Sequence, residues 1–438
     1  MKRFLKHIFF LIFIFTAAVM NAQPTSMTHK VVAGETVYGI SHKYGLTEDE
    51  LRNANPNLID PGFGLKAGDV IVIPAKGKKN VSNKPFQGKT INIGVMLPLN
   101  ETKDGKNMVE YYRGILMACD YLKREKFDIN VHAWDVNRFT DVDKVLKENG
   151  AAKCDIIFGP YYSSQVSKLS SFSKQHDIRL VVPFAPGGPS LHTNKNLFVL
   201  GEFNPGFNEM VCNKFFSLFK KINPIIIDCN DAKNAKGDFT MTARHYFDKE
   251  DIKYNITNLN SSNDKFIKAF KKSKNNIVIL NSSGSNEFKA AAQKIKAVRK
   301  KYPKIDITVL GYNEWFLFEK YNVAEFAANN VYIPTFFYYN AHSSATKKIE
   351  ADYYRWFKSN MQNAAPRYAI AGYDHANFFI RGLNKFGKSF DGSDKQNIPG
   401  YIQMPLHFKS VSAEGGHQNT AFMFIHYKED QSIESIAY

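Results

Sequence analysis

The sequence predicts an α/β protein in two parts: a small N-terminal strand–helix–helix–strand unit, and a two-lobed region built on doubly wound parallel sheets. Short apolar runs alternate with helical segments from residue 90 onward, an order typical of parallel sheets covered by helices. The alternation occurs as two sets, over about residues 90–200 and 201–333. A stretch rich in Lys, Asn, Gly and Ser, residues 76–89, precedes them and is typical of a flexible linker.

Residues 1–22 are predicted to be a signal peptide. Lys2, Arg3 and Lys6 precede the apolar run Ile8–Phe15, and small residues lead to a cleavage site after Ala22. The apolar run is shorter than the roughly 20 residues that a membrane-spanning helix needs. We therefore expect an exported protein of the periplasm or cell envelope, associated with the wall.

The charge balance favours an anionic partner. The formal net charge is +17, and removal of the three cations of the signal peptide leaves +14. For an exported protein, wall polymers and lipid head groups are better candidates than nucleic acid. The alternative is that a Lys-rich surface merely keeps the protein soluble.

Cysteine usage indicates neither a metal site nor a disulfide framework. Cys119, Cys154, Cys212 and Cys229 are widely spaced, and each lies in an apolar context. We expect buried free thiols, with Cys212–Cys229 as the first pair to test for a disulfide. Without a CxxC or Cys/His cluster, no metal and no cofactor are expected.

The compact unit at residues 29–75 begins with a predicted strand and helix. An extended segment starts at Val31-Val32. Thr36 is a favourable N-cap for a short helix through Tyr44, and Gly45 follows as a helix-ending residue.

A second helix and strand complete this unit. Thr47 and Glu50 have the spacing of a capping box, and Asn55-Pro56 ends the helix. The segment Val70–Ile73 is predicted to be the second strand, closed by Pro74.

This pattern resembles a LysM domain over essentially the whole family unit. The resemblance rests on Val31–Val37, Ile40-Ser41, Tyr44-Gly45, Leu51, Asn55–Asn57, Leu65, Gly68 and Pro74. It implies binding of N-acetylglucosamine-containing glycans such as peptidoglycan in a shallow groove between two loops. The groove walls implied by the resemblance are Gly34, Glu35, Thr36, Val37, Asn55, Pro56, Asn57 and Leu58.

Two features qualify that implied groove. Ile59–Gly64 lengthens the loop before Leu65 and so changes one wall. The motif residues also have a purely structural interpretation, since Gly34, Thr36, Asn55 and Pro56 suit caps and turns.

The larger region contains the following predicted elements. Strands are expected at Ile91–Leu97, Ile129–Trp134, Asp155–Phe158, Leu180–Pro183, Pro224–Ile227, Asn276–Leu280, Ile307–Leu310, Leu406–Ser410 and Ala421–Tyr427. Helices are expected at Asn107–Arg124, Val142–Glu148 and Ser163–His176, with a long helical stretch at Ser343–Gly387.

These elements predict two lobes joined by chain crossings within residues 90–438. Lobe 1 is expected to comprise about residues 90–200 plus 334–398, and lobe 2 about 201–333 plus 399–438. Ligands of open α/β sheets bind at the carboxyl ends of the strands, so a ligand cleft is expected between the lobes.

This region resembles type I periplasmic binding proteins, particularly the branched-chain amino acid receptors. The segments that carry the resemblance are Ile93–Leu99, Tyr112–Ile115, Phe158–Ser164, Val182–Ala185 and Ala371–Asp374. In that group a helix start after the third strand holds a substrate carboxylate, which corresponds here to Ser163 and Ser164. Hydroxyl and free N–H groups there favour an anion, although Ser163 also suits a simple N-cap.

Further cleft residues follow from the same resemblance. Tyr161 precedes the two serines, and Ala185 stands where the family offers backbone contacts. Near predicted strand ends lie Glu202, Asn230, Asn313 and Glu314. Lys236-Gly237 replaces the Tyr-Gly of the amino acid receptors, so the resemblance does not specify an amino acid as ligand.

The motifs of common enzymes are absent from the sequence. No GxSxG or HExxH occurs, and Gly88-Lys89-Thr90 lacks the earlier Gly of a phosphate-binding loop. We therefore predict a non-enzymatic envelope protein that binds glycan through the small unit and a small solute in the cleft. The alternative is a scaffold or regulator of cell-wall synthesis that uses the two-lobed region to contact an envelope protein.

Overall fold

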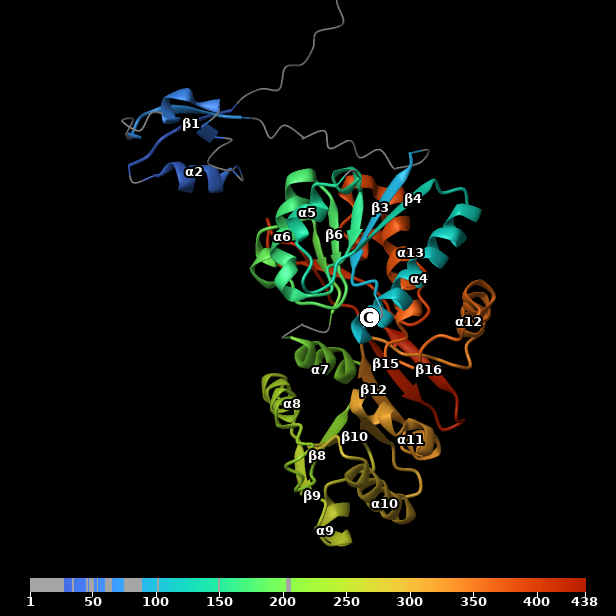
Figure 1. The fold of residues 1–438 in the computed structure, drawn as a ribbon. Helices are drawn as coiled ribbons and strands as arrows, with labels where there is room; N and C mark the ends of the chain where they lie inside the picture. The colour runs from blue at the N-terminus through green and yellow to red at the C-terminus, as the bar shows by residue number, and fades with distance from the viewer. Residues whose placement is uncertain are drawn as a thin grey trace, which may run out of the picture. The chain divides into compact units, whose positions relative to one another are not determined.

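The computed structural model describes residues 27–33, 35–44, 46, 51–52, 54–59, 65–74, 89–100, 102–148, 150–201 and 206–438. It divides the chain into two compact units, Met1–Asn83 and Lys84–Tyr438 (Figure 1).

The small unit is built on two antiparallel strands, β1 (Met27–Lys30) and β2 (Val70–Ile73). Between them lie helix α2 (Val37–Lys43) and the short 3-10 helix η1 (Pro56–Ile59). Apolar side chains from these elements form one core, which comprises Val31, Ile40, Leu51, Leu58, Ile71 and Ile73.

The first strand of this unit lies earlier than predicted. Pairing with β2 runs from Met27 to Lys30, and beyond it Val31 N donates to Asp69 O and Val31 O accepts from Gly68 N, both at 2.8 Å. Val32 is exposed because the chain turns there. The predicted Gly45 helix end and the Thr47–Glu50 capping box lie outside the described residues.

The first sheet of the large unit has the strand order β13-β14-β7-β6-β5-β3-β4. All neighbouring strands are parallel except β13 and β14. The strands are β3 (Ile91–Leu97), β4 (Ile129–Asp135), β5 (Ile156–Phe158), β6 (Arg179–Val182), β7 (Leu197–Val199), β13 (Phe408–Ser410) and β14 (His417–Asn419).

Helices cover both faces of this sheet. On one face α4 (Lys103–Arg124) and α13 (Tyr368–Phe386) share a core with Val95 of β3. On the other face α5 (Val142–Leu146) and α6 (Ser163–His176) share a core with Met96. Successive side chains of β3 therefore point to opposite faces of the sheet and pack into two different cores. Helix α12 (Ser344–Phe357) packs outside α4, through a small cluster that contains Met117 and Tyr353.

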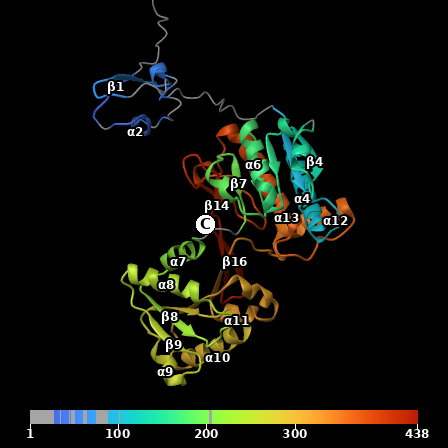
Figure 2. The same cartoon turned by 60° about the vertical axis from the view of Figure 1, so that its left-hand side comes forward.

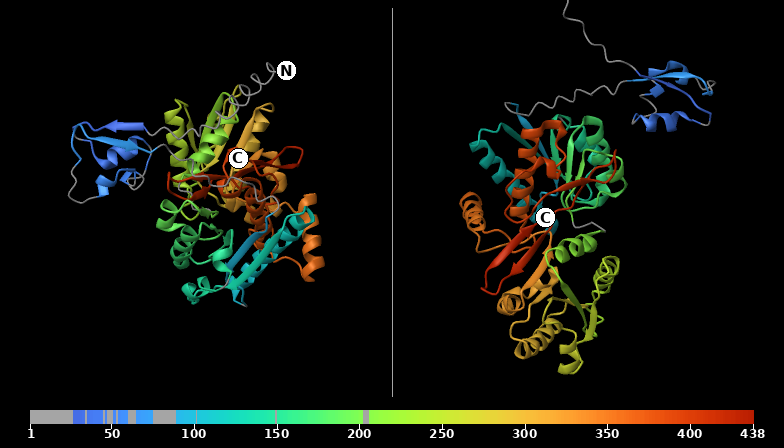
Figure 3. Two further views of the ribbon diagram at one scale, coloured as in Figure 1. Left: turned by 90° about the horizontal axis from the view of Figure 1, so that it is seen from above. Right: turned by 180° about the vertical axis from the view of Figure 1, so that it is seen from behind.

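The second sheet has the order β16-β15-β12-β11-β10-β8-β9; β15 is antiparallel to both of its neighbours, β12 and β16, and the other neighbouring strands are parallel. Its strands are β8 (Ile222–Asp228), β9 (Asn255–Asn258), β10 (Asn275–Leu280), β11 (Ile307–Leu310), β12 (Val331–Thr335), β15 (Met423–Tyr427) and β16 (Ile433–Ala437). Figure 3 shows β15 beside β12. The core here is strongly aromatic, with Trp315 stacked on Phe326 at 5.7 Å between ring centroids.

Five helices accompany the second sheet: α7 (Phe207–Ser217), α8 (Gly237–Lys249), α9 (Asn263–Lys268), α10 (Ser285–Lys301) and α11 (Val323–Ala328). The remaining 3-10 helices are η2 (Ala151–Lys153), η3 (Gly188–His192), η4 (Asn313–Leu317), η5 (Glu319–Tyr321), η6 (Gly387–Ser389) and η7 (Asp394–Gln396).

In the described part of the chain, no helix combines the length and apolarity that crossing a bilayer requires.

The predicted α/β class is confirmed, and so is the parallel pairing of the main strands. The predicted helical stretch Ser343–Gly387 is two helices: α12 ends at Phe357, where Lys358 takes the left-handed conformation, and α13 begins at Tyr368, after Pro366. The prediction assigned all residues from 399 onward to lobe 2, but the strands after residue 399 are shared between the two sheets. Strands β13 and β14 join the first sheet, since β14 pairs in parallel with β7, and only β15 and β16 join the second.

The four cysteines are buried, as predicted, and none forms a disulfide. Burial raises the pKa of the Cys119, Cys154, Cys212 and Cys229 thiols to about 12. Reactive thiolates are therefore disfavoured at neutral pH.

Helices α4 and α13 approach each other closely through two glycines (Figure 2). A Cβ at Gly114 would overlap the carbonyl oxygen of Ala369 on α13, and a Cβ at Gly372 would overlap that of Tyr111 on α4. The contact is therefore backbone against backbone, so a larger residue would force the helices apart.

We predict that Gly114→Ala destabilises the large unit by about 1–3 kcal/mol or more. The matched control is Gly237→Ala, because no atom lies within 4 Å of the added Cβ at the start of α8. Gly237→Ala should leave the stability of the large unit unchanged or raise it by up to about 1 kcal/mol. Scanning calorimetry of both full-chain variants checks this, and equal melting temperatures would contradict the close approach.

Candidate functional site

In the small unit, the side chain of Glu35 is engaged in the fold. Its Oε2 accepts hydrogen bonds from Val32 N at 2.8 Å and contacts His29 Nε2 at 2.7 Å, and Lys43 Nζ lies 3.3 Å from Oε1. The backbone bond from Val32, followed by that from His29, lowers the pKa of Glu35 to about 2. The carboxylate thus ties the loop after β1 to α2 and does not project freely to a ligand.

The other residues of this loop have structural roles as well. Thr36 Oγ1 accepts a hydrogen bond from Gly39 N at 3.0 Å, as expected of the N-cap of α2. Val37 packs against the core of the unit. Gly34 lies outside the described residues.

The second predicted wall is anchored by Asn55. Its Nδ2 donates to Leu51 O at 2.9 Å and Val72 O at 2.7 Å, and its Oδ1 accepts from Val72 N at 2.7 Å. Leu58 is buried in the core, whereas Asn57 is exposed on η1, which begins at Pro56. Among the described side chains of the two walls, Asn57 is therefore the one best placed to meet a ligand.

In lobe 1 the predicted anion site is the start of α6. Ser163 and Ser164 are exposed and open the helix, but Ser163 is not its N-cap. That position belongs to Tyr162, whose side chain makes no capping bond. The N-terminus of α6 is therefore uncapped by a side chain and retains the electrostatic preference for an anion.

Sequence analysis missed a carboxylate that lies close to this helix start. Asp104, in the first turn of α4, accepts hydrogen bonds from the hydroxyl groups of Tyr161 at 3.4 Å and Tyr162 at 3.3 Å. Burial, followed by the charge of Asp104, raises the pKa of Tyr161 to about 12. In the sequence, Asp104 resembles any acidic residue in the first turn of a helix. Its two tyrosine partners are therefore identified only by the tertiary structure.

Aromatic rings surround this cluster. Phe184, just after β6, lies 6.3 Å from Tyr161 and 5.5 Å from Tyr368 between ring centroids. Ala185 is buried in the core beneath, so its side chain is not available to a ligand. Glu202 lies outside the described residues.

In lobe 2 the predicted residues bond mainly with one another and with their neighbours. Asn230 exchanges hydrogen bonds of 3.0 Å with Asn258, which in turn binds Asp228. Glu314 pairs with Lys236, whose ammonium lies 5.2 Å from the ring centroid of Tyr312. Asn313 is exposed at the start of η4. The polar groups of Asn230 and Glu314 thus already have hydrogen-bond or ion-pair partners within lobe 2. By themselves they do not form a preorganised ligand site.

Two hollows formed by described residues lie elsewhere in the large unit. One, of about 760 Å³, runs between α4, α12, α13 and residues 397–402, and the other, of about 380 Å³, adjoins residues 392–407. Neither is lined by any of the predicted cleft residues. No local sequence motif marks either hollow, because each gathers segments that are far apart in the chain.

The segment 402–404 that borders both hollows is held by a buried carboxylate. Asp374 accepts hydrogen bonds from the backbone N–H groups of Ile402, Gln403 and Met404 at 2.8, 2.8 and 2.9 Å. Burial raises the pKa of Asp374 to about 7, although these three bonds oppose the shift. The carboxyl group fastens the segment to α13.

The described residues contain scattered His, Cys, Asp and Glu side chains. Within them, no group of three or more His, Cys, Asp and Glu side chains could hold a metal ion. His375 is fully buried against Tyr111, with Nδ1 2.9 Å from the tyrosine hydroxyl. Burial lowers the pKa of His375 to about 3, so this imidazole is neutral.

Comparison with known proteins identifies the small unit. The family model of the LysM domain matches residues 29–74. None of the curated proteins matches the chain.

Several solved structures are similar to the large unit at low sequence identity, each with a TM-score below 0.5. An ABC transporter substrate-binding protein from Desulfitobacterium hafniense in complex with Leu has 14% identity and a TM-score of 0.40, covering 80% of this chain and 100% of that chain. A putative branched-chain amino acid ABC transporter from Rhodospirillum rubrum has 11% identity and a TM-score of 0.49, covering 79% and 100%. The C-domain of LpoA from Haemophilus influenzae, a regulator of PBP1A, has 13% identity and a TM-score of 0.46, covering 79% and 99%.

Residues 29–74 are therefore a LysM domain, and the large unit has the predicted α/β fold with two sheets of mainly parallel strands.

We predict that Asp374 makes the stability of the large unit depend on pH. Because its folded pKa lies above its unfolded value near 4, the stabilisation is full below pH 4 and is lost as pH rises through about 7. The loss should be on the order of a few kcal/mol.

Asp374→Asn should lower stability but flatten this dependence between pH 4 and 7. Asp143→Asn, at an exposed carboxylate on α5, should keep the slope of the wild-type protein. Denaturant unfolding at a series of pH values measures both, and identical slopes for Asp374→Asn and wild type would contradict the assignment.

Proposed function

We propose that this protein is an exported, non-enzymatic component of the cell envelope that binds N-acetylglucosamine-containing glycan through residues 29–74. The observation that carries the proposal is the LysM match over that range. It is supported by the two-stranded pairing and the single core of the unit. The predicted signal peptide and the basic charge are consistent with a location at the wall.

The glycan contacts proposed here are largely backbone groups of the two loops. The side chains of Glu35, Thr36, Asn55 and Leu58 bond or pack within the unit, so we assign them the role of fixing the two loops. Recognition then relies on shape and on Asn57. A single shallow site of this kind should bind weakly.

We predict that the full chain co-sediments with insoluble peptidoglycan and that residues 84–438 alone do not. Asn57→Ala should reduce the bound fraction several-fold without lowering the melting temperature, because the side chain is exposed. The matched control is Lys66→Ala, at an exposed residue in the turn before β2. Equal sedimentation of the full chain and the 84–438 fragment would refute glycan binding by the LysM unit.

For the large unit, we propose that lobe 1 contributes the main part of a small-solute site. The supporting observation is that the uncapped start of α6 lies next to a half-buried Asp104 with two tyrosine hydroxyls and a ring of aromatic side chains. This arrangement offers an anion-favouring helix end, one carboxylate and flat apolar surfaces. It suits a polar solute such as a wall fragment, peptide or amino acid.

A thermal-shift screen of the full chain against wall fragments, peptides and amino acids tests the solute site. A solute that binds the folded state raises the melting temperature of the large unit. Asp104→Asn should diminish that rise, whereas Asp143→Asn should leave it unchanged. If no compound shifts the transition, or if both variants behave alike, the solute site is refuted.

The second candidate function is contact with another envelope protein through the large unit. A specific observation favours it: the hollow of about 760 Å³ between α4, α12, α13 and residues 397–402 is lined by none of the predicted cleft residues. A groove there is suited to a partner that approaches lobe 1 from outside.

A further inference from the structure

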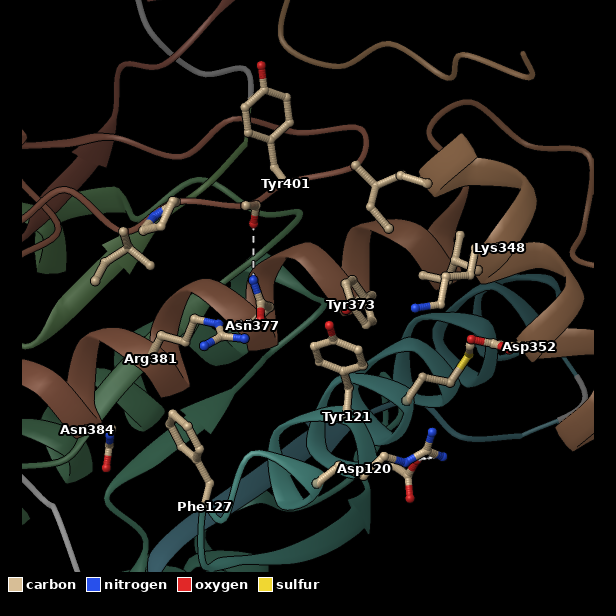
Figure 4. Close-up of a pocket in the computed structure, with 18 of the residues that line it drawn as sticks. Asp120, Tyr121, Phe127, Lys348, Asp352, Tyr373, Asn377, Arg381, Asn384 and Tyr401 are labelled. Carbon is tan, nitrogen blue, oxygen red and sulfur yellow. Dashed lines mark hydrogen bonds and ion pairs between the residues drawn. The ribbon is translucent and has the colours of Figure 1, made fainter. Parts of the chain in front are cut away.

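The groove between α4, α12, α13 and residues 397–402, here called the α12 groove, is long and lined on several sides (Figure 4). Its lining runs from Tyr373 to Lys385 on α13 and from Ala345 to Trp356 on α12. At 1.5 Å per helical residue, these spans are about 18 and 16 Å. An extended peptide of about five or six residues covers the same length.

The surface of the groove is rich in exposed aromatic side chains. Tyr121 of α4, Trp356 of α12 and Tyr401 are 40%, 40% and 41% exposed. Tyr373 lies against Tyr121, with 6.4 Å between ring centroids. Tyr and Trp are the residues that contribute most to the centres of protein interfaces, so the groove has the composition of a contact surface.

Charge along the groove is unbalanced in favour of cations. The two lining carboxylates, Asp120 and Asp352, are paired on their own helices with Arg124 and Arg355. Arg381 is held in two bonds of 2.7 Å by Glu125.

Two lysines account for the excess of positive charge. Lys348 and Lys385 line the groove, are exposed and form no ion pair within the described residues. The Lys348 ammonium lies 5.5 Å from the ring centroid of Tyr121, and that of Lys385 lies 5.1 Å from the ring of Phe386. These cations are therefore available to carboxylates of a bound chain.

Hydrogen bonds within the large unit hold the walls of the α12 groove in place in the absence of a partner. Asn377 Nδ2 donates to Gly400 O at 3.0 Å, and Asp374 holds the backbone of residues 402–404. Helix α12 is docked through the Tyr353 hydroxyl, which donates to Glu110 at 2.6 Å and accepts from Arg113 at 2.9 Å. A preorganised site loses little conformational entropy on binding.

We propose that the α12 groove binds an acidic peptide segment of a partner protein, with carboxylates facing Lys348 and Lys385 and an apolar side chain against Tyr121 and Trp356. The length of the groove favours an extended segment over a small molecule. The excess of cations selects acidic over basic sequences. This inference deepens the protein-contact function proposed above and rests on it, but it is independent of glycan binding.

The test is selection from a library of random peptides about twelve residues long, displayed against the immobilised full chain. Selections run in parallel on the wild type, on Lys348→Glu/Lys385→Glu, and on the control Lys249→Glu/Lys300→Glu. The control changes two exposed lysines on α8 and α10 and so matches the charge change away from the groove.

The expected result is enrichment of sequences that combine Asp or Glu with an aromatic or aliphatic residue, on the wild type and the control alone. A synthetic consensus peptide should bind at least about tenfold more weakly to Lys348→Glu/Lys385→Glu and to Trp356→Ala, and more weakly as salt is raised. Trp356→Ala should keep the wild-type melting temperature, because the side chain is partly exposed.

Three outcomes overturn the proposal: enriched sequences that are not acidic, binding that the groove variants leave unchanged, or binding to vesicles of anionic lipid with no acidic peptide selected. Co-sedimentation with peptidoglycan, measured on the same variants, should be unaffected by the groove substitutions. The experiments therefore distinguish a failure of the glycan-binding proposal from a failure of the peptide-binding proposal.

Discussion

The backbone contact between α4 and α13 is the constraint on which the large unit depends. Gly114 and Gly372 allow each helix to approach the carbonyl groups of the other, and no larger residue fits there. Because the helices are this close, Tyr111 meets His375 and Glu125 meets Arg381. One helix pair thus supports the core over the first sheet on one side and the α12 groove on the other.

The same helix pair orients both proposed binding surfaces. The first turn of α4 places Asp104 beside Tyr161 and Tyr162, near the start of α6. Toward its other end, α4 presents Tyr121 to the groove. Asp374 of α13 fastens residues 402–404 next to that groove. A displacement of the two helices would therefore alter both surfaces together.

Local signals in the sequence were sufficient to predict much of the fold. Strand Ile91–Leu97 and helix Ser163–His176 appear with the predicted bounds, because apolar runs and helical spacing depend on near neighbours. The short strands β7, β9, β12, β14 and β16 were missed, as was the return of β13 and β14 to the first sheet. Their pairing depends on distant partners such as β14 with β7, which no local pattern encodes.

The sites were less predictable than the fold, for the same reason. The LysM pattern located the right loops, but Glu35 and Asn55 turn their polar atoms toward the protein, and only the structure reveals those partners. The α12 groove combines α4 with residues 397–402, nearly 300 positions further along the chain. Its lysines and aromatic residues have no motif, and each one alone is typical of an ordinary helix surface.

The protein as proposed combines two binding functions in separate compact units. A weak glycan site is sufficient for localisation, because a tethered large unit is kept at high effective concentration near partners in the same envelope layer. The distinctive recognition then belongs to the large unit, where the structure offers an aromatic, basic groove outside the predicted cleft.

The central claim is that glycan recognition resides in the LysM unit and not in the large unit. Amide hydrogen exchange of the full chain, with and without N-acetylglucosamine oligomers, tests it most directly. The account predicts slower exchange within residues 29–74 on addition of the oligomers and unchanged exchange throughout residues 84–438. Slower exchange confined to the large unit, or unchanged exchange in both units at saturating oligomer, would contradict it.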